Sequence, residues 1–78
     1  MGHFMEKADL LEDLTAATAQ AEQGKVNLEA QKAVADALHA MGKDWSGAER
    51  ILQNLERTQN DNLAHLDRIL NALEEKAL

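Results

Sequence analysis

The chain contains no cysteine, no proline and no tyrosine, and only one tryptophan and one phenylalanine. Without cysteine it can form neither a disulfide nor a thiolate zinc site, and it has no thiol nucleophile. The shortage of aromatic and β-branched residues disfavours a sheet, and without proline nothing in the sequence forces a helix to end. The apolar 45% is mostly alanine and leucine. This composition predicts an ordered, all-α protein.

The charge is acidic, with fourteen Asp and Glu against eight Lys and Arg and a formal net charge of -6. This charge weakens any case for a nucleic-acid or membrane partner. No apolar run is long enough to span a bilayer, and the N-terminus lacks the pattern of a signal peptide. We therefore expect a cytoplasmic protein. Residues 1–4, which include His3, precede a second methionine and have the form of a cloning remnant, so no prediction rests on them.

The stretch from Met5 to Met41 carries one stripe whose spacing alternates between four and three residues. The stripe consists of Leu10, Leu14, Ala17, Ala21, Gly24, Leu28, Gln31, Ala35 and Leu38. Such spacing predicts an amphipathic helix with a coiled-coil seam. Gly24 costs a helix interior about 1 kcal/mol relative to alanine, so a break there is an alternative. Because the stripe keeps its phase across Gly24, we expect one continuous helix over about 5–41.

A turn is predicted at 42–45, because Gly42 follows the stripe and can adopt the left-handed conformation that ends helices. Asp44 and Ser46 are both candidate N-caps for a second helix over about 46–76, and Ser46 with Glu49 has capping-box spacing. So short a connection makes the helices antiparallel neighbours. We therefore expect residues 1–78 to form a single helical-hairpin domain.

The second helix has its own apolar stripe. Its members are Ala48, Ile51, Leu52, Leu55, Gln59, Asn62, Leu63, Leu66, Ile69, Leu70 and Leu73. Folding it back about the turn places three leucines, at 63, 66 and 70, against the small residues at 24, 21 and 17. Large residues then meet small ones, as close packing requires.

The same register brings Gln31 close to Gln59 and Asn62. One interpretation is a polar layer inside the seam that fixes register or oligomeric state, as buried asparagine does in coiled coils. The alternative is that these three amides face water.

Two helices share one seam and cannot enclose a core, so apolar residues are left over. These candidate interface residues are Leu11, Val34, Met41, Trp45, Ile51, Leu63 and Ile69. Dimerisation of the hairpin into a four-helix bundle would cover them, and a different protein would do so equally well. Trp45 is notable because large aromatic residues are favoured interface anchors. It can also cap the end of the core or pack against Met41.

The sequence offers no catalytic constellation. Ser46 is the only serine, and capping accounts for it; there is no glycine-rich phosphate loop and no paired carboxylates on an apolar face. His39 and His65 each have an aspartate one turn away, but the hairpin separates them, so we expect surface histidines without a metal. We expect a protein that is not an enzyme and that needs no cofactor.

Around the turn, a leucine-bearing helix ends in Gly-x-Asp and is followed by an Ala-Glu start and a Leu-x-x-Leu-Glu helix. These motifs are carried by Gly42, Asp44, Ala48, Glu49, Leu52, Leu55, Glu56, Asp67, Arg68 and Leu70. Over residues 31–70 the chain resembles a group of short proteobacterial hypothetical proteins. The resemblance implies the hairpin fold and a bacterial origin, and it carries no function.

A second resemblance rests on Trp45-Ser46-Gly47, which is similar to the Trp-x-Gly turn of the secreted WXG100 hairpin dimers. The chain is shorter than that family and has no tyrosine for its C-terminal export signal.

The leading hypothesis is a homodimeric protein–protein interaction or scaffold module of unknown role. The alternatives are a secreted WXG100-like hairpin and a small acidic inhibitor of a nucleic-acid-binding protein.

Overall fold

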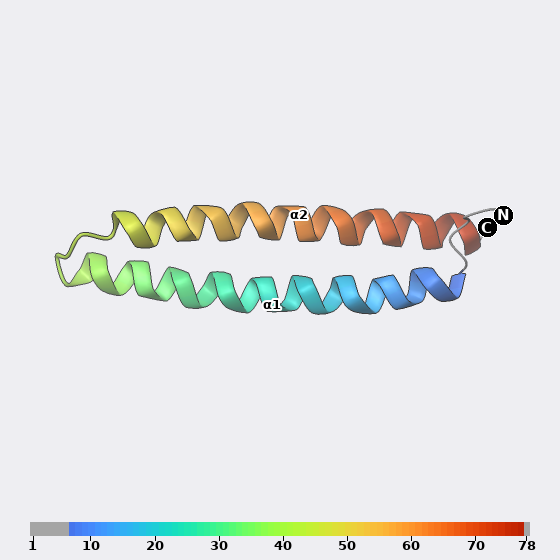
Figure 1. Ribbon diagram of the computed structural model, residues 1–78, viewed down its shortest axis with the longest axis horizontal. Coiled ribbons are helices and arrows are strands. Elements are labelled where there is room, and N and C mark those ends of the chain that lie inside the picture. Colours follow the sequence, from blue (N-terminus) through green and yellow to red (C-terminus); the bar gives the residue numbers. More distant parts are fainter. Residues whose placement is uncertain (1–6, 78) are drawn as a thin grey trace.

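The computed structural model describes residues 7–77, which form two helices, α1 (Lys7–Ala40) and α2 (Ser46–Ala77). The helices run antiparallel, side by side, in a rod of 59 × 18 × 18 Å with their connection at one end (Figure 1). This confirms the expected all-α antiparallel hairpin. Met5 and His3 lie outside the described residues.

The end of α1 is fixed by Gly42. The Lys43 N–H donates to the Leu38 carbonyl at 2.9 Å, and the Gly42 N–H donates to the His39 carbonyl at 3.0 Å. This pair of bonds is a Schellman motif, which satisfies carbonyls that the helix end would otherwise leave unpaired. It requires a left-handed residue, and Gly42 has φ 69°. The helix therefore stops where the sequence places its glycine.

The start of α2 is set by Asp44. Its Oδ1 accepts from the backbone N–H of Ser46 at 3.0 Å and from the Ser46 hydroxyl at 2.8 Å. Those two bonds, the backbone bond first, hold the pKa of the Asp44 carboxyl below its usual value. Ser46 is thus the first residue of α2 and not its cap, and its hydroxyl donates to Asp44 instead of forming the predicted capping box with Glu49.

The contact between the helices follows the four–three spacing of the sequence. Every member of the predicted stripe in α1, from Leu10 to Leu38, is buried or half-buried. In α2 the buried and half-buried residues with the same spacing are Ala48, Leu52, Leu55, Gln59, Asn62, Leu66, Ile69 and Leu73. These two rows together are called the seam below.

The core within this seam is thin. The buried apolar residues are Leu10, Ala17, Ala21, Ala35, Ala48 and Ile69. Most are alanines, and an alanine side chain contributes only about 0.8 kcal/mol, the value of one buried methylene. The accessible surface is 6040 Å², whereas a globular monomer of this mass has about 4,700 Å². The hairpin therefore exposes much more surface than a compact protein of its size.

The register across the seam differs from the prediction. A side chain at Gly24 would meet Gln59 and Asn62, not Leu63. Leu63 and Leu70 lie outside the seam and are about half exposed, at 49% and 46%. The predicted pairing of large leucines with small residues is therefore wrong for these two positions. A shift of one residue turns a helical side chain by 100°, so Asn62 and Leu63 cannot both face α1.

Candidate functional site

The most specific contact between the helices lies at Gly24 in the middle of α1. The Gln59 amide occupies the space that a side chain at Gly24 would fill, with Cδ 2.9 Å from the position of such a Cβ. From there Gln59 Nε2 donates to the Ala21 carbonyl at 2.8 Å, and Gln59 Oε1 accepts from Asn62 Nδ2 at 3.2 Å. A carbonyl oxygen has two lone pairs, so Ala21 can accept this bond in addition to its helical bond. The glycine thus admits a polar cross-link between α1 and α2.

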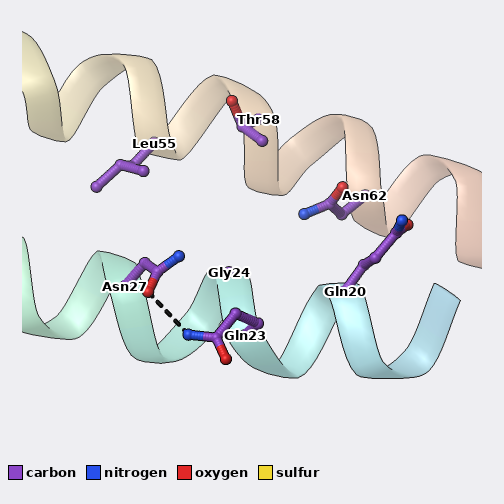
Figure 2. A pocket seen from close by; sticks show the side chains of 7 residues that line it. All are labelled: Gln20, Gln23, Gly24, Asn27, Leu55, Thr58 and Asn62. Carbon is purple, nitrogen blue, oxygen red and sulfur yellow. Dashed lines mark hydrogen bonds between the residues drawn. The ribbon is translucent and has the colours of Figure 1, made fainter. Parts of the chain in front are cut away.

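A shallow groove of about 270 Å³ opens beside this cross-link (Figure 2). It is lined by Gln20, Gln23, Gly24, Asn27, Leu55, Thr58 and Asn62. On its α1 side, Gln23 Nε2 donates to Asn27 Oδ1 at 2.9 Å, and Gln20 extends toward Asn62 on α2. All the polar groups of the lining are neutral amides and one hydroxyl. The groove can offer hydrogen bonds to a ligand or a peptide, but its lining includes no charged group and no general base.

Gln31 does not belong to this cluster. Its Nε2 donates to the Ala48 carbonyl at 3.1 Å, close to the turn, whereas Gln59 donates to Ala21. Ten residues of α1 separate Gln31 from Ala21, which is about 15 Å along a helix. The predicted single polar layer of Gln31, Gln59 and Asn62 is therefore two separate cross-links. Within the described residues, no buried side-chain nitrogen or oxygen lacks a hydrogen-bond partner.

The exposed apolar side chains are the second candidate site. The large ones are Leu11, Val26, Val34, Met41, Trp45, Ile51, Leu63 and Leu70. All of the predicted surplus residues except Ile69 are among them. Ile69 is only 5% exposed and lies in the seam, so it belongs to the hairpin's own core and is no interface residue. The exposure of Val26 and Leu70 was not predicted from the sequence.

Helical periodicity divides most of these residues between two sides of the rod. In an antiparallel pair, residues that directly follow a seam residue in either helix lie on one side, and residues that directly precede one lie on the other. The first side carries Leu11, Leu63 and Leu70 among charged residues and is called the lysine–glutamate face. Its charges are mixed in sign on α1, where Lys25 and Lys32 lie beside Glu22, Glu29 and Asp36, and acidic on α2, where they are Glu49, Glu56 and Asp67. The second side carries Gln20, Asn27, Val34, Met41, Ile51 and Thr58 and is called the groove face.

The apolar residues gather at opposite ends of these two faces. On the lysine–glutamate face, Leu11 and Leu70 lie toward the end far from the turn, and Leu63 lies near the middle of α2. On the groove face, Val34 and Ile51 lie toward the turn, with Met41 where α1 ends. A single rod therefore presents two apolar patches that face in opposite directions.

Trp45 lies in the turn and packs on His39. Their rings form an edge-to-face pair with centroids 5.1 Å apart and an interplanar angle of 67°. This geometry is the preferred one for aromatic pairs. Trp45 is still 37% exposed. The aromatic ring thus covers the last turn of α1 and leaves part of its surface for another contact.

The described part of the chain holds no cluster of three histidine, aspartate or glutamate side chains that could ligate a metal. Neither of its two helices is both long enough and apolar enough to cross a membrane.

Comparisons with protein-family models, with curated proteins and with solved structures find no match for the chain. The structure therefore supports the two-helix hairpin, and the comparisons identify no family or homologue for it.

Proposed function

We propose that the protein is a non-enzymatic protein–protein interaction module that works as a homodimer. The single observation that supports this is the large amount of exposed apolar side chain on a hairpin with a thin core. Monomeric proteins rarely leave extended apolar patches open, and such patches commonly mark protein interfaces. The surplus lies on regular helices, which is the geometry of a four-helix bundle formed from two hairpins.

The size of the rod supports the same proposal. Its broad side of 59 × 18 Å corresponds to roughly 1,000 Å², and a stable interface needs about 800 Å² from each partner. One face is therefore large enough to hold a second hairpin. The opposite face then remains for another protein. Such an arrangement would suit a scaffold that joins a copy of itself on one side to a different partner on the other.

The proposal is tested by light scattering over a dilution series, with helicity followed by circular dichroism in the same samples. A highly helical species of twice the 8.6 kDa mass supports the homodimer. A monomer that stays fully helical at all concentrations contradicts the homodimer, because the thin seam would then be enough to keep a single hairpin folded. A dimer that loses helix as it dissociates on dilution also supports self-association, because folding then depends on concentration. A chain that stays monomeric and only partly helical at every concentration contradicts self-association and assigns the missing half of the core to another protein.

A second candidate function is the secreted WXG100-like hairpin. Trp45-Ser46-Gly47 lies at the bend between α1 and α2, as the corresponding motif does in the family that the sequence resembles. Export of the chain into the medium of its native host, dependent on Trp45, would support this candidate. Retention of the chain inside the cells would contradict it.

A further inference from the structure

The groove face carries no charged side chain in the half nearer the turn, called the near-turn half below. The positions that directly precede a seam residue, from Gln20 to Met41 on α1 and from Gly47 to Thr58 on α2, hold no aspartate, glutamate, lysine or arginine. At the same levels, acidic side chains outnumber the two lysines of the lysine–glutamate face. Two copies of this acidic chain can therefore meet without like charges on the groove face, whereas two lysine–glutamate faces repel each other.

The near-turn half has an exposed apolar side chain at one end and the groove at the other. Met41 is 60% exposed where α1 ends, and the groove of about 270 Å³ lies beside Gly24 (Figure 2). Methionine is a flexible apolar side chain that fits irregular spaces. The groove has room for one such side chain. Its amides at Gln23 and Asn27 bond each other, so an occupant can cover them without breaking that bond.

We propose that the near-turn half of the groove face binds the same half of a second copy, with the two hairpins end for end. This inference rests on the proposed homodimer and adds to it the face and the orientation. Met41 and Gly24 are 17 residues apart on the same helix. A twofold axis midway between them, across the rod, brings the Met41 of each copy to the groove of the other. In this arrangement α1 lies against α1 and α2 against α2.

The residues of this face closest to the axis are apolar or small. Gln31, beside the midpoint on α1, donates to the Ala48 carbonyl, and Ile51 follows Ala48 by three residues. Ile51 therefore lies within about one turn of the axis. The Ile51 side chains of the two copies, each 51% exposed, then face each other, while Val34 of one copy faces Ala30 of the other. The contact thus covers apolar side chains with apolar side chains.

The orientation with turn beside turn is disfavoured by the far half of the groove face. The charged residues of that half are Asp9, Asp13, Asp61, Arg68 and Glu75. Turn beside turn brings these mainly acidic halves together, and like charges oppose association. End for end, they lie outside the contact, and only Asp61 reaches its edge, where the turn of the other copy carries both Lys43 and Asp44.

The size of the contact suits a second copy. From Gln20, at the edge of the groove, to Met41 the helix rises about 32 Å. With the 18 Å width of the rod, the contact covers about 600 Å² of each copy, which is the area at which specific interfaces begin. The end-for-end overlap is therefore sufficient for a dimer, and it leaves the lysine–glutamate faces of both copies open.

The decisive experiment places opposite charges at Ile51 in two separate variants. Ile51→Glu and Ile51→Lys should each dimerise at least about tenfold more weakly than the wild type, because like charges then meet across the axis. An equimolar mixture should recover association as a heterodimer, because the opposite charges then face each other. Sedimentation measures the association and circular dichroism the helicity. If a variant alone loses helix, the mixture should regain it.

The matched control places the same charges at Leu63, which is 49% exposed on the lysine–glutamate face. Leu63→Glu and Leu63→Lys should each dimerise like the wild type, and their mixture should show no preference for the heterodimer. If the wild type dimerises but the Ile51 variants dimerise equally well, or their mixture forms no heterodimer, the inference is overturned and the homodimer stands. A wild type that is monomeric throughout would instead contradict the proposed homodimer itself.

The orientation is tested separately with a single cysteine at Glu74→Cys, which is unique because the chain has no other cysteine. Glu74 is 23 residues along α2 from Ile51, toward the far end of the rod. Spin labels there should lie roughly 70 Å apart in the end-for-end dimer. Turn beside turn would place them roughly 20–25 Å apart, the width of two helices. The shorter distance in an intact dimer would overturn the proposed orientation.

Discussion

Gln59 fills the space above Gly24, and its amide reaches past that glycine to the Ala21 carbonyl 2.8 Å away. A glycine inside a long helix is unfavourable by about 1 kcal/mol relative to alanine. Here the cost has a structural reason, because any larger residue would displace the Gln59 amide. The pair thus fixes the register of α2 along α1 with one glycine and one long polar side chain.

The first prediction concerns the coupling of these two residues. With Gln59→Ala in place, Gly24→Ala should raise the free energy of unfolding by about 1 kcal/mol, since only helix propensity changes. With Gln59 present, the same substitution should lose this gain, because the new Cβ breaks a hydrogen bond of about 1 kcal/mol. Urea unfolding of the four proteins at one fixed concentration measures the difference. Equal stabilisation in both backgrounds would show that Gln59 does not hold Gly24.

The second prediction concerns the turn. Gly42→Ala should lower the free energy of unfolding by about 1 kcal/mol, because an L-residue is strained at the φ of 69° that the Schellman motif requires. Gly47→Ala is the matched control, since Gly47 lies within α2 and a Cβ there would meet nothing within 4 Å. The control should be stabilised by up to about 1 kcal/mol. Thermal unfolding followed by circular dichroism would refute this account if both substitutions stabilise.

The third prediction follows from the lowered pKa of Asp44. A carboxyl whose pKa is depressed by folding contributes stability above its unfolded pKa, which is about 3.9, and loses that contribution as the pH falls through its folded pKa. The wild type should therefore be more stable than Asp44→Asn at pH 7, and the difference should vanish in strong acid. Unfolding curves at several pH values test this. A difference that stays constant down to pH 2 would mean that the charge of Asp44 contributes nothing.

The fourth prediction distinguishes a buried residue of the seam from an exposed apolar residue. Ile69→Ala should lower the free energy of unfolding by at least about 2 kcal/mol, because Ile69 is buried in the seam. Val26→Ala is the control, since Val26 is 57% exposed and belongs to neither face defined above. The control should change stability by less than about 0.5 kcal/mol. Similar small effects of both substitutions in urea unfolding would contradict the burial of Ile69.

The sequence predicts the hairpin and the course of α1 well, because each depends on local signals. The four–three spacing from Leu10 to Leu38 identifies the buried side of α1, and Gly42 alone determines where that helix ends. The start of α2 is less certain, because Asp44 and Ser46 both have capping side chains. Only their geometry shows that Asp44 accepts and that Ser46 donates.

The register and the candidate interface were harder to predict, because the stripe of α2 contains adjacent candidates. Hydrophobicity favours Leu63 over Asn62 for the seam, whereas strict four–three spacing favours Asn62, and the spacing prevails. The same choice puts Ile69 inside and Leu70 outside. Gly24 indicates the correct register, because it has no side chain and so leaves room for the polar side chains of Gln59 and Asn62 opposite it. Strict spacing in α2 would have found both Leu70 and the correct register.

The central claim is that the exposed apolar faces of the hairpin are covered by self-association, so that folding and dimerisation are coupled. The most direct test is the urea midpoint of unfolding at two protein concentrations that differ a hundredfold, followed by circular dichroism. Coupled dimerisation predicts a higher midpoint at the higher concentration, by roughly 1 M urea, since the change is worth about 2.7 kcal/mol. Identical midpoints at both concentrations would contradict the claim.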